Sequence, residues 1–189
     1  ISDCLVGSEM CIRDSYNSSK PIALNGSGKS PAAANVANLR DKGVEQIEVE
    51  TPHAVNVPGA IAAWTRLNTD YGTKDLAELL QPAINYAKNG FPVAPRVALD
   101  WTDNLPKLLG DEVSSKILTV SGEAPKAGTK FAQPLLGTTL EAIAKGGRDA
   151  FYTGEIAEDM VTRLNKLGGL HTLDDFASCA ADYVEPISV

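Results

Sequence analysis

The sequence predicts a mostly α-helical chain with a few short strands. Apolar residues recur at helical spacing in several runs, and glycine, proline or asparagine bounds these runs. Short apolar or alternating runs beside turn residues, such as Pro21–Leu24, instead fit strands. The expected helices cover residues 32–39, 60–70, 73–80, 82–88, 94–104, 135–147 and 154–167, and the further expected strands cover residues 44–50, 116–120 and 184–189.

Composition and charge exclude several classes of partner. The chain has 189 residues, of which 43% are hydrophobic and 22% are charged, so it can bury one core. Its net charge of −7 argues against binding of nucleic acid or of an anionic membrane. No uncharged apolar run reaches the roughly 18 residues that a membrane span needs. Because no cluster of His and carboxylate residues has metal-ligand spacing, we expect no metal.

The first fifteen residues do not belong with the rest of the chain. Residues 5–14 can be back-translated as CTC GTG GGC TCG GAG ATG TGT ATA AGA GAC, which matches the transposon adapter used to prepare sequencing libraries. We therefore hypothesise that residues 1–15 are translated adapter or assembly debris, and we leave them out of the fold prediction. The alternative is a genuine, irregular N-terminus. Resequencing the locus without that library chemistry decides between the two.

Residues 16–189 are expected to form a partial domain that is truncated at both ends. The chain has no initiator methionine and ends on a strand-like run, 184–189, that predicts entry into a sheet. Because Cys4 and Cys11 lie in the excluded segment, no disulfide framework can be argued. Cys179 then fits a small, half-buried helix residue better than a nucleophile. The compartment stays open between periplasm and cytoplasm.

A glycine-rich stretch from Asn25 to Pro31, Asn-Gly-Ser-Gly-Lys-Ser-Pro, is the best candidate for a binding site. Gly26 and Gly28 can take the positive φ values of a tight turn, which follows a predicted strand. This arrangement places the short polar side chains of Asn25 and Ser27 at a strand end, where they can face a cleft. The candidate substrate-binding residues are therefore Asn25, Gly26 and Ser27. The same spacing also fits an ordinary turn, and it is not a nucleotide-binding motif.

Five stretches, taken in order, resemble the gamma-glutamyltranspeptidase family. Each is weak alone, but their order and spacing together are specific, and they extend from about Pro21 to Val189 without a large gap. They are Asn25-Gly-Ser-Gly-Lys-Ser-Pro31, Val57-Pro-Gly59 with the helix after it, Leu80-Gln-Pro-Ala-Ile84 running into Asn89-Gly-Phe-Pro-Val93, Phe151-Tyr-Thr-Gly-Glu-Ile-Ala157, and Gly168-Gly-Leu-His-Thr-Leu-Asp-Asp-Phe176. The chain resembles the middle of that family's large subunit.

This resemblance implies an α/β fold, the αββα sandwich of N-terminal-nucleophile hydrolases in the full protein, with the present part mostly helical. In the family, a precursor cuts itself into a large and a small subunit, and the new N-terminal Thr of the small subunit is the nucleophile. We therefore expect no catalytic residue in this chain and no cofactor. The expected partners are its own small subunit after self-cleavage and a small-molecule amide substrate. The expected enzyme is a gamma-glutamyltransferase or glutathione hydrolase-like amidohydrolase.

The resemblance also bears on specificity. In the family, an arginine from this part of the large subunit grips the α-carboxylate of the γ-glutamyl group through a bidentate pair. Aligned on Pro31, that position is about Ser27, which cannot supply the charge, and Lys29 is not geometrically equivalent. The Asn-Gly-Ser-Gly form resembles the branch of amidohydrolases and acylases that includes oxamate amidohydrolase and cephalosporin acylase. The expected substrates are γ-glutamyl or other short acyl amides, and the alternative function is a catalytically silent helical scaffold or binding module.

Several further residues fit structural roles better than catalytic ones. His53 stands alone in a loop, so we expect a hydrogen-bonded structural histidine rather than a base, and we expect the same of His171. The run Thr172-Leu-Asp-Asp175 has the form of a capping box, which accounts for Asp175. Trp64 and Trp101 fit core anchors.

Overall fold

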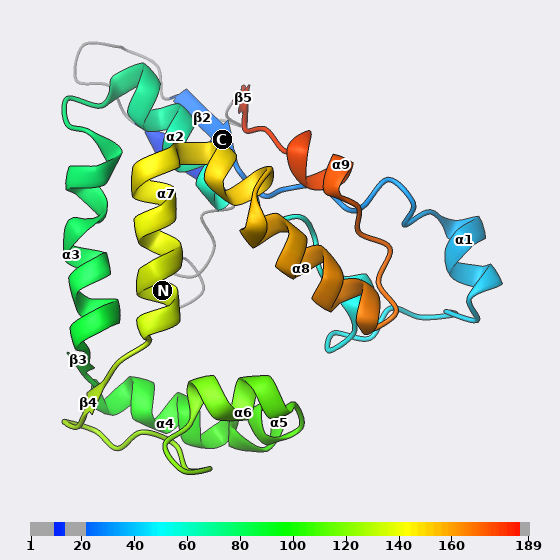
Figure 1. The fold of residues 1–189 in the computed structure, drawn as a ribbon. Coiled ribbons are helices and arrows are strands. Elements are labelled where there is room, and N and C mark those ends of the chain that lie inside the picture. Colours follow the sequence, from blue (N-terminus) through cyan, green and yellow to red (C-terminus); the bar gives the residue numbers. More distant parts are fainter. Residues whose placement is uncertain (1–9, 14–21, 186–189) are drawn as a thin grey trace. The chain divides into compact units, whose positions relative to one another are not determined.

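The structure is a computed structural model that describes residues 10–13 and 22–185. The chain divides into two compact units, the first formed by residues 1–76 and 142–189 and the second by residues 77–141. Helices dominate the described residues, as the sequence predicts (Figure 1). The elements are β1 (Met10–Arg13), β2 (Ile22–Asn25), α1 (Val36–Asp41), the 3₁₀ helix η2 (Pro52–Ala54), α2 (Ala60–Tyr71), α3 (Leu76–Asn89), β3 (Phe91–Pro92), α4 (Pro95–Asp103), α5 (Leu105–Leu109), α6 (Glu112–Leu118), β4 (Lys130–Phe131), α7 (Pro134–Tyr152), α8 (Glu155–Lys166), α9 (Leu173–Ala177) and β5 (Asp182–Val184).

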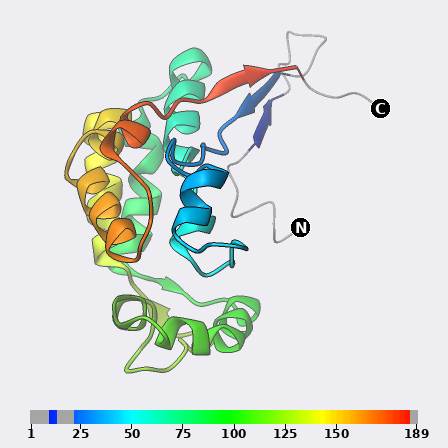
Figure 2. The same ribbon diagram turned by 90° about the vertical axis from the view of Figure 1, so that its right-hand side faces the viewer.

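The first unit contains a three-stranded antiparallel sheet with β2 in its centre (Figure 2). Asn25 of β2 pairs with Asp182 of β5 on one side and with Met10 of β1 on the other. The predicted strand at β2 is therefore confirmed. Of the predicted C-terminal strand, β5 ends at Val184 and residues 186–189 lie outside the described residues. β1 falls in the segment that we interpret as adapter-derived, and the origin of that segment is a question that only the DNA answers.

The helices of the first unit begin and end close to the predicted positions. α2 starts after Gly59 and stops at Gly72, and α8 starts after Gly154. Inside α7, Gly147 has a φ of 61° and breaks the helix, so that a separate last turn follows the predicted stop. The core of this unit is formed by Ala23, Leu24, Val57, Ile61, Ala62, Ala63, Ile143, Tyr152, Ala157, Val161, Phe176 and Cys179.

In the second unit, one helix replaces the two that the sequence predicts. The runs at residues 73–80 and 82–88 join into α3, which contains Pro82 in its interior. Gly90, with a φ of 83°, ends this helix as predicted, and Phe91 then pairs with Phe131 in the β3–β4 ladder. The core of this unit is formed by Leu80, Ile84, Ala87, Val93 and Phe131. Trp101 on α4 packs edge-on against Phe131, with ring centroids 4.7 Å apart, as a core anchor would.

Two predicted strands and one predicted core residue are wrong. Residues 44–50 form bends and turns, and Val49 in this segment is 86% exposed. Residues 116–118 belong to helix α6 because Asp111 caps its start and accepts a hydrogen bond from the Ser114 N–H at 3.1 Å. The short helix expected at residues 32–39 begins later, at Val36. Trp64 is 37% exposed on α2 and is not a core anchor in this chain.

Candidate functional site

The three predicted binding residues lie together at the end of β2. The Asn25 side-chain carbonyl oxygen accepts hydrogen bonds from the Ser27 N–H, at 3.0 Å, and from the Ser27 hydroxyl. This local bonding is the reason that the chain turns sharply after the strand. Asn25 and Ser27 are exposed, whereas Gly26 between them is buried. The stretch therefore presents two neutral polar side chains on a fixed turn.

The glycines of this turn make room for a second loop and not for a side chain. We call the two segments 25–31 and 55–59 together the glycine-loop junction. Gly28 has a φ of 78°, and a Cβ built on it would lie 1.8 Å from the Val57 carbonyl oxygen. A Cβ on Gly59 would lie 2.2 Å from the Gly26 carbonyl oxygen. The Val57 N–H donates to the Lys29 carbonyl oxygen at 3.0 Å, so the two backbones are in direct contact.

The segment 55–59 is also held from its other side. In the tautomer protonated at Nε2, His171 donates to the Val55 carbonyl oxygen at 2.8 Å. The Tyr152 hydroxyl donates to the Pro58 carbonyl oxygen at 2.5 Å. Both side chains are buried and both come from distant parts of the chain. His171 thus has the structural role that the sequence predicts, because it fixes one end of the junction.

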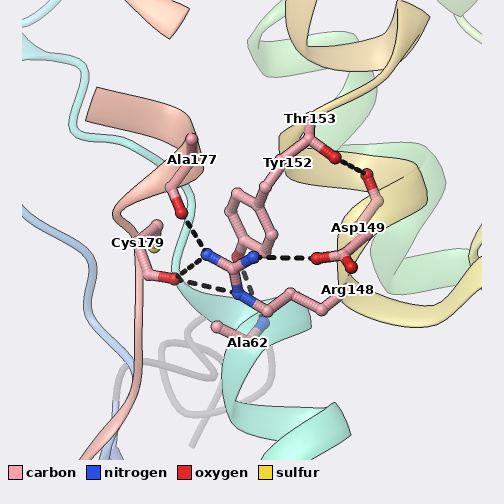
Figure 3. Close-up of polar contacts among 7 residues, drawn as sticks. All are labelled: Ala62, Arg148, Asp149, Tyr152, Thr153, Ala177 and Cys179. Atoms are coloured by element: carbon pink, nitrogen blue, oxygen red, sulfur yellow. Dashed lines mark hydrogen bonds and ion pairs between the residues drawn. The ribbon is translucent and has the colours of Figure 1, made fainter. Parts of the chain in front are cut away.

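Tyr152 belongs to a cluster on the last turn of α7 (Figure 3). Its hydroxyl accepts a hydrogen bond from the Ala62 N–H at 3.1 Å, which caps the start of α2 where Gly59 offers no side chain. The Arg148 guanidinium lies over the Tyr152 ring, 5.1 Å from its centroid. Arg148 also donates to the Cys179 carbonyl oxygen, at 2.8 Å from Nη2, and to the Ala177 carbonyl oxygen.

Burial keeps two groups of this cluster uncharged. It raises the pKa of the Tyr152 hydroxyl far above its ordinary value, although the Ala62 N–H opposes the shift. Burial also raises the pKa of the Cys179 thiol, against the opposing effect of the Tyr152 hydroxyl. Cys179 is 6% exposed and follows α9 instead of lying inside a helix. A buried, protonated thiol fits the predicted structural role and not that of a nucleophile.

Asp175 fixes the far end of the segment 25–31. The predicted capping box is present, because the Asp175 carboxylate accepts hydrogen bonds from the Thr172 N–H at 2.9 Å and the Thr172 hydroxyl at 2.7 Å. The other carboxylate oxygen accepts the Ala32 N–H at 2.9 Å. Burial raises the pKa of Asp175, but these donors outweigh it and lower the pKa below the ordinary value. Asp175 thus ties α9 to the residue after Pro31.

A cavity of about 260 Å³ opens beside the junction. Its walls come from the segment 29–32, from Val57, and from the end of α9. The lining residues are Lys29, Ser30, Ala32, Val57, Asp175, Ser178, Cys179 and Ala180. Lys29 is among these residues, and Asn25 and Ser27 are not.

His53 does not match its prediction fully. It lies in η2, and its buried Nδ1 has no hydrogen-bond partner among the described residues. Among the residues that the structure describes, no group of three or more His, Cys, Asp or Glu side chains could bind a metal ion. Within residues 10–13 and 22–185, every helix is too short or too polar to cross a bilayer.

Sequence reasoning missed the residues that hold the junction from outside. In the sequence, Tyr152 stands out only as part of the stretch Phe151–Ala157, and Arg148 lies in none of the five family-like stretches. No local pattern marks them, because their partners lie 94 residues away at Pro58 and 31 residues away at Cys179. The one signal that the sequence offers is the pair Gly146-Gly147, which sets the last turn of α7 apart.

Comparisons with known proteins show what this chain is similar to. The profile of the family described as Gamma-glutamyltranspeptidase matches residues 7–189. The chain is 36% identical to the glutathione hydrolase-like YwrD proenzyme of Bacillus subtilis, covering 87% of this chain and 31% of that protein. It is 34% identical to the oxamate amidohydrolase proenzyme of Klebsiella pneumoniae, covering 89% of this chain and 33% of that protein. The chain thus spans about a third of the length of these relatives.

The fold also matches a solved structure. The gamma-glutamyltranspeptidase of Helicobacter pylori superimposes with a TM-score of 0.87 and 29% identity, covering 96% of this chain and 53% of that one. This match confirms the predicted fold, a mostly helical part of an α/β N-terminal-nucleophile hydrolase. The family resemblance is likewise confirmed over nearly the whole chain. The chain belongs to the gamma-glutamyltranspeptidase family.

Proposed function

We propose that the chain is part of the large subunit of a self-processing amidohydrolase or acyltransferase, and that it is inactive by itself. The observation that carries this proposal is the family match over residues 7–189. The names of the relatives support the processing step, because both relatives described above are named as proenzymes. The partner would be the small subunit released by self-cleavage. With a net charge of −7, the chain is not proposed to bind nucleic acid or a membrane surface.

The proposed chemistry is acyl transfer. The N-terminal Thr of the small subunit, encoded downstream of Val189, would attack the amide carbonyl through its Oγ while its own α-amine takes the proton. The amine of the substrate would leave, and water or a second amine would release the acyl group. The role proposed for the present chain is to bind the acyl group at Asn25, Gly26 and Ser27. A rigid turn suits this role, because binding then costs little further ordering.

The geometry of the turn favours a neutral contact at position 27. The Ser27 hydroxyl is already bonded to the Asn25 side chain, and it carries no charge. A bidentate grip on a carboxylate requires a guanidinium, which a serine does not supply. We therefore propose that the enzyme accepts γ-glutamyl amides poorly in comparison with other short acyl amides.

The test uses the complete reading frame, expressed without residues 1–15. Mass spectrometry of the purified protein shows whether it cleaves itself, and it identifies the first residue of the smaller product. Release of chromophore is then measured from a γ-glutamyl anilide and from anilides of short uncharged acyl groups. The control is the same protein with that first residue, expected to be Thr, replaced by Ala.

Each outcome has a distinct meaning. Self-cleavage with faster release from the uncharged acyl anilides supports the proposal in full. Efficient release from the γ-glutamyl anilide would show that Ser27 does not exclude glutamyl substrates. An uncleaved protein without release would favour a silent scaffold instead of an enzyme.

A further inference from the structure

Tyr152 joins two segments that are far apart in the sequence. Its ring is fully buried, and its hydroxyl bridges the Pro58 carbonyl oxygen, at 2.5 Å, and the Ala62 N–H, at 3.1 Å. The first contact is with the glycine-loop junction and the second is with the first turn of α2. The hydroxyl therefore sets the position of the loop relative to the helix that follows it.

The position of Pro58 affects the turn that carries Asn25 and Ser27. Pro58 lies between Val57 and Gly59, whose backbones contact Gly28 and Gly26 too closely to admit a Cβ. Because packed backbones transmit displacements to their neighbours, we expect a shift of Pro58 to move the turn that carries Asn25 and Ser27.

The hydroxyl is not needed to fill space. A phenylalanine would occupy the same volume and would avoid burying a polar group, which costs free energy unless it is hydrogen-bonded. The ring is held independently of the hydroxyl by Arg148, whose guanidinium lies over it and is bonded to the Cys179 carbonyl oxygen (Figure 3). What the hydroxyl adds is the pair of bonds to Pro58 and Ala62.

We infer that Tyr152 is a positioning residue for substrate binding, acting through Pro58 and Gly59 on the turn at Asn25–Ser27. This inference rests on the proposed function, because it needs that turn to bind the substrate. The residue is buried and its hydroxyl is bonded to backbone groups of this chain, so the inferred role is positioning and not direct contact with the substrate. Its loss should therefore weaken binding of the substrate and leave the chemical step unchanged.

The test compares Tyr152→Phe with Ile143→Val in the complete protein. Ile143 is buried on the same helix, at 1% exposure, so its truncation loosens the core without removing a bond to the junction. Two quantities are measured for each variant. The first is amide hydrogen exchange of residues 22–35 and 55–60 by mass spectrometry, and the second is KM and kcat for the best anilide substrate of the wild type.

In Tyr152→Phe, we expect exchange in these two segments to rise about tenfold and KM to rise about tenfold, with kcat within about twofold of the wild type. Ile143→Val should leave both KM and the exchange of these segments near the wild-type values. Equal exchange and equal KM in the two variants would overturn the inference. Faster exchange in Tyr152→Phe with an unchanged KM would overturn it as well, because the turn would then not need to be positioned.

The exchange measurement separates this inference from the proposed function. If the wild type releases no chromophore from any anilide, the proposed function fails while the coupling can still be judged. Faster exchange in Tyr152→Phe than in Ile143→Val then supports the coupling of Tyr152 to the turn, and equal exchange rejects it.

Discussion

The two units hold their irregular backbone in different ways. In the first unit, buried side chains bond to loop backbone across long sequence separations, such as 94 residues between Tyr152 and Pro58 and 116 between His171 and Val55. In the second unit, several polar contacts lie one helical turn apart, such as Arg96 with Asp100. Its turns are instead held by backbone hydrogen bonds, such as that from the Val93 N–H to the Thr129 carbonyl oxygen at 2.9 Å, and by apolar packing, such as the contact of Trp101 with Phe131.

This difference indicates which backbone is preorganised. A loop that is held by several long-range bonds keeps one geometry even where its own sequence would allow others, and that property suits a binding site. A helical layer held by apolar faces needs only its helices to be approximately in place, and that property suits a scaffold. The comparison therefore predicts large effects for substitutions at the glycine-loop junction and small ones for polar contacts in the second unit.

The largest effect is expected from Gly28→Ala. The new Cβ would lie 1.8 Å from the Val57 carbonyl oxygen, and the residue would keep an unfavourable φ of 78°. We expect a loss of about 3 kcal/mol or more in the free energy of unfolding, measured by urea denaturation of the complete protein.

A matched control exists at Gly43, which has a φ of 76° and no atom within 4 Å of its added Cβ. Gly43→Ala keeps the strained φ without the clash, so the expected loss is about 1 kcal/mol. Similar losses at the two positions would mean that the junction can open without cost, and the idea of a preorganised turn would be wrong.

The same junction shows how far the sequence alone can be read. Its glycines, its prolines and the capping box at Thr172 are local signals, and they placed the turn, the start of α2 and the role of Asp175 correctly. The partner of each glycine was not predictable, because Gly28 and Val57 meet only in the folded chain. The sequence predicts only that Gly26 and Gly28 form a tight turn, and the structure adds that Gly28 and Gly59 each lie against the backbone of the other loop.

The errors in the predicted secondary structure have a similar cause. The alternating residues 44–50 fit a strand locally, but a strand also needs a neighbour, and in the described residues this segment pairs with none. Residues 116–118 have a strand-like composition, but they form a helix because Asp111 caps the start of α6. Local patterns thus located the candidate turn, while the bond of Tyr152 to Pro58 and the packing of Arg148 over the Tyr152 ring required the structure.

A smaller effect, which depends on pH, is expected from Asp175→Asn. The carboxylate accepts hydrogen bonds from the Ala32 N–H and from two donors of Thr172, and an amide cannot accept all of them. At pH 7 we expect a loss of about 1–2 kcal/mol in the free energy of unfolding. The control is Asp174→Asn, because Asp174 lies in the first turn of the same helix and is not the capping partner of Thr172.

The pH dependence of this loss follows from the lowered pKa of Asp175 in the folded chain. A carboxyl with a depressed folded-state pKa contributes stability above its unfolded pKa, near 3.8, and this contribution disappears as the pH falls through the folded value. The difference between wild type and Asp175→Asn should therefore be constant at neutral pH and shrink below about pH 4. A difference that persists unchanged at pH 2 would mean that the carboxylate charge is not what holds Ala32.

The smallest effect is expected in the second unit, from Glu141→Gln. The Glu141 carboxylate forms an ion pair with the Lys88 ammonium at 2.5 Å, but both side chains are more than a third exposed. Water and salt screen such a pair, so its removal should change the free energy of unfolding by less than about 1 kcal/mol. The addition of about 0.5 M NaCl should abolish this difference. A larger loss that survives the added salt would contradict the contrast between the two units, because the second unit would then also depend on a specific polar contact.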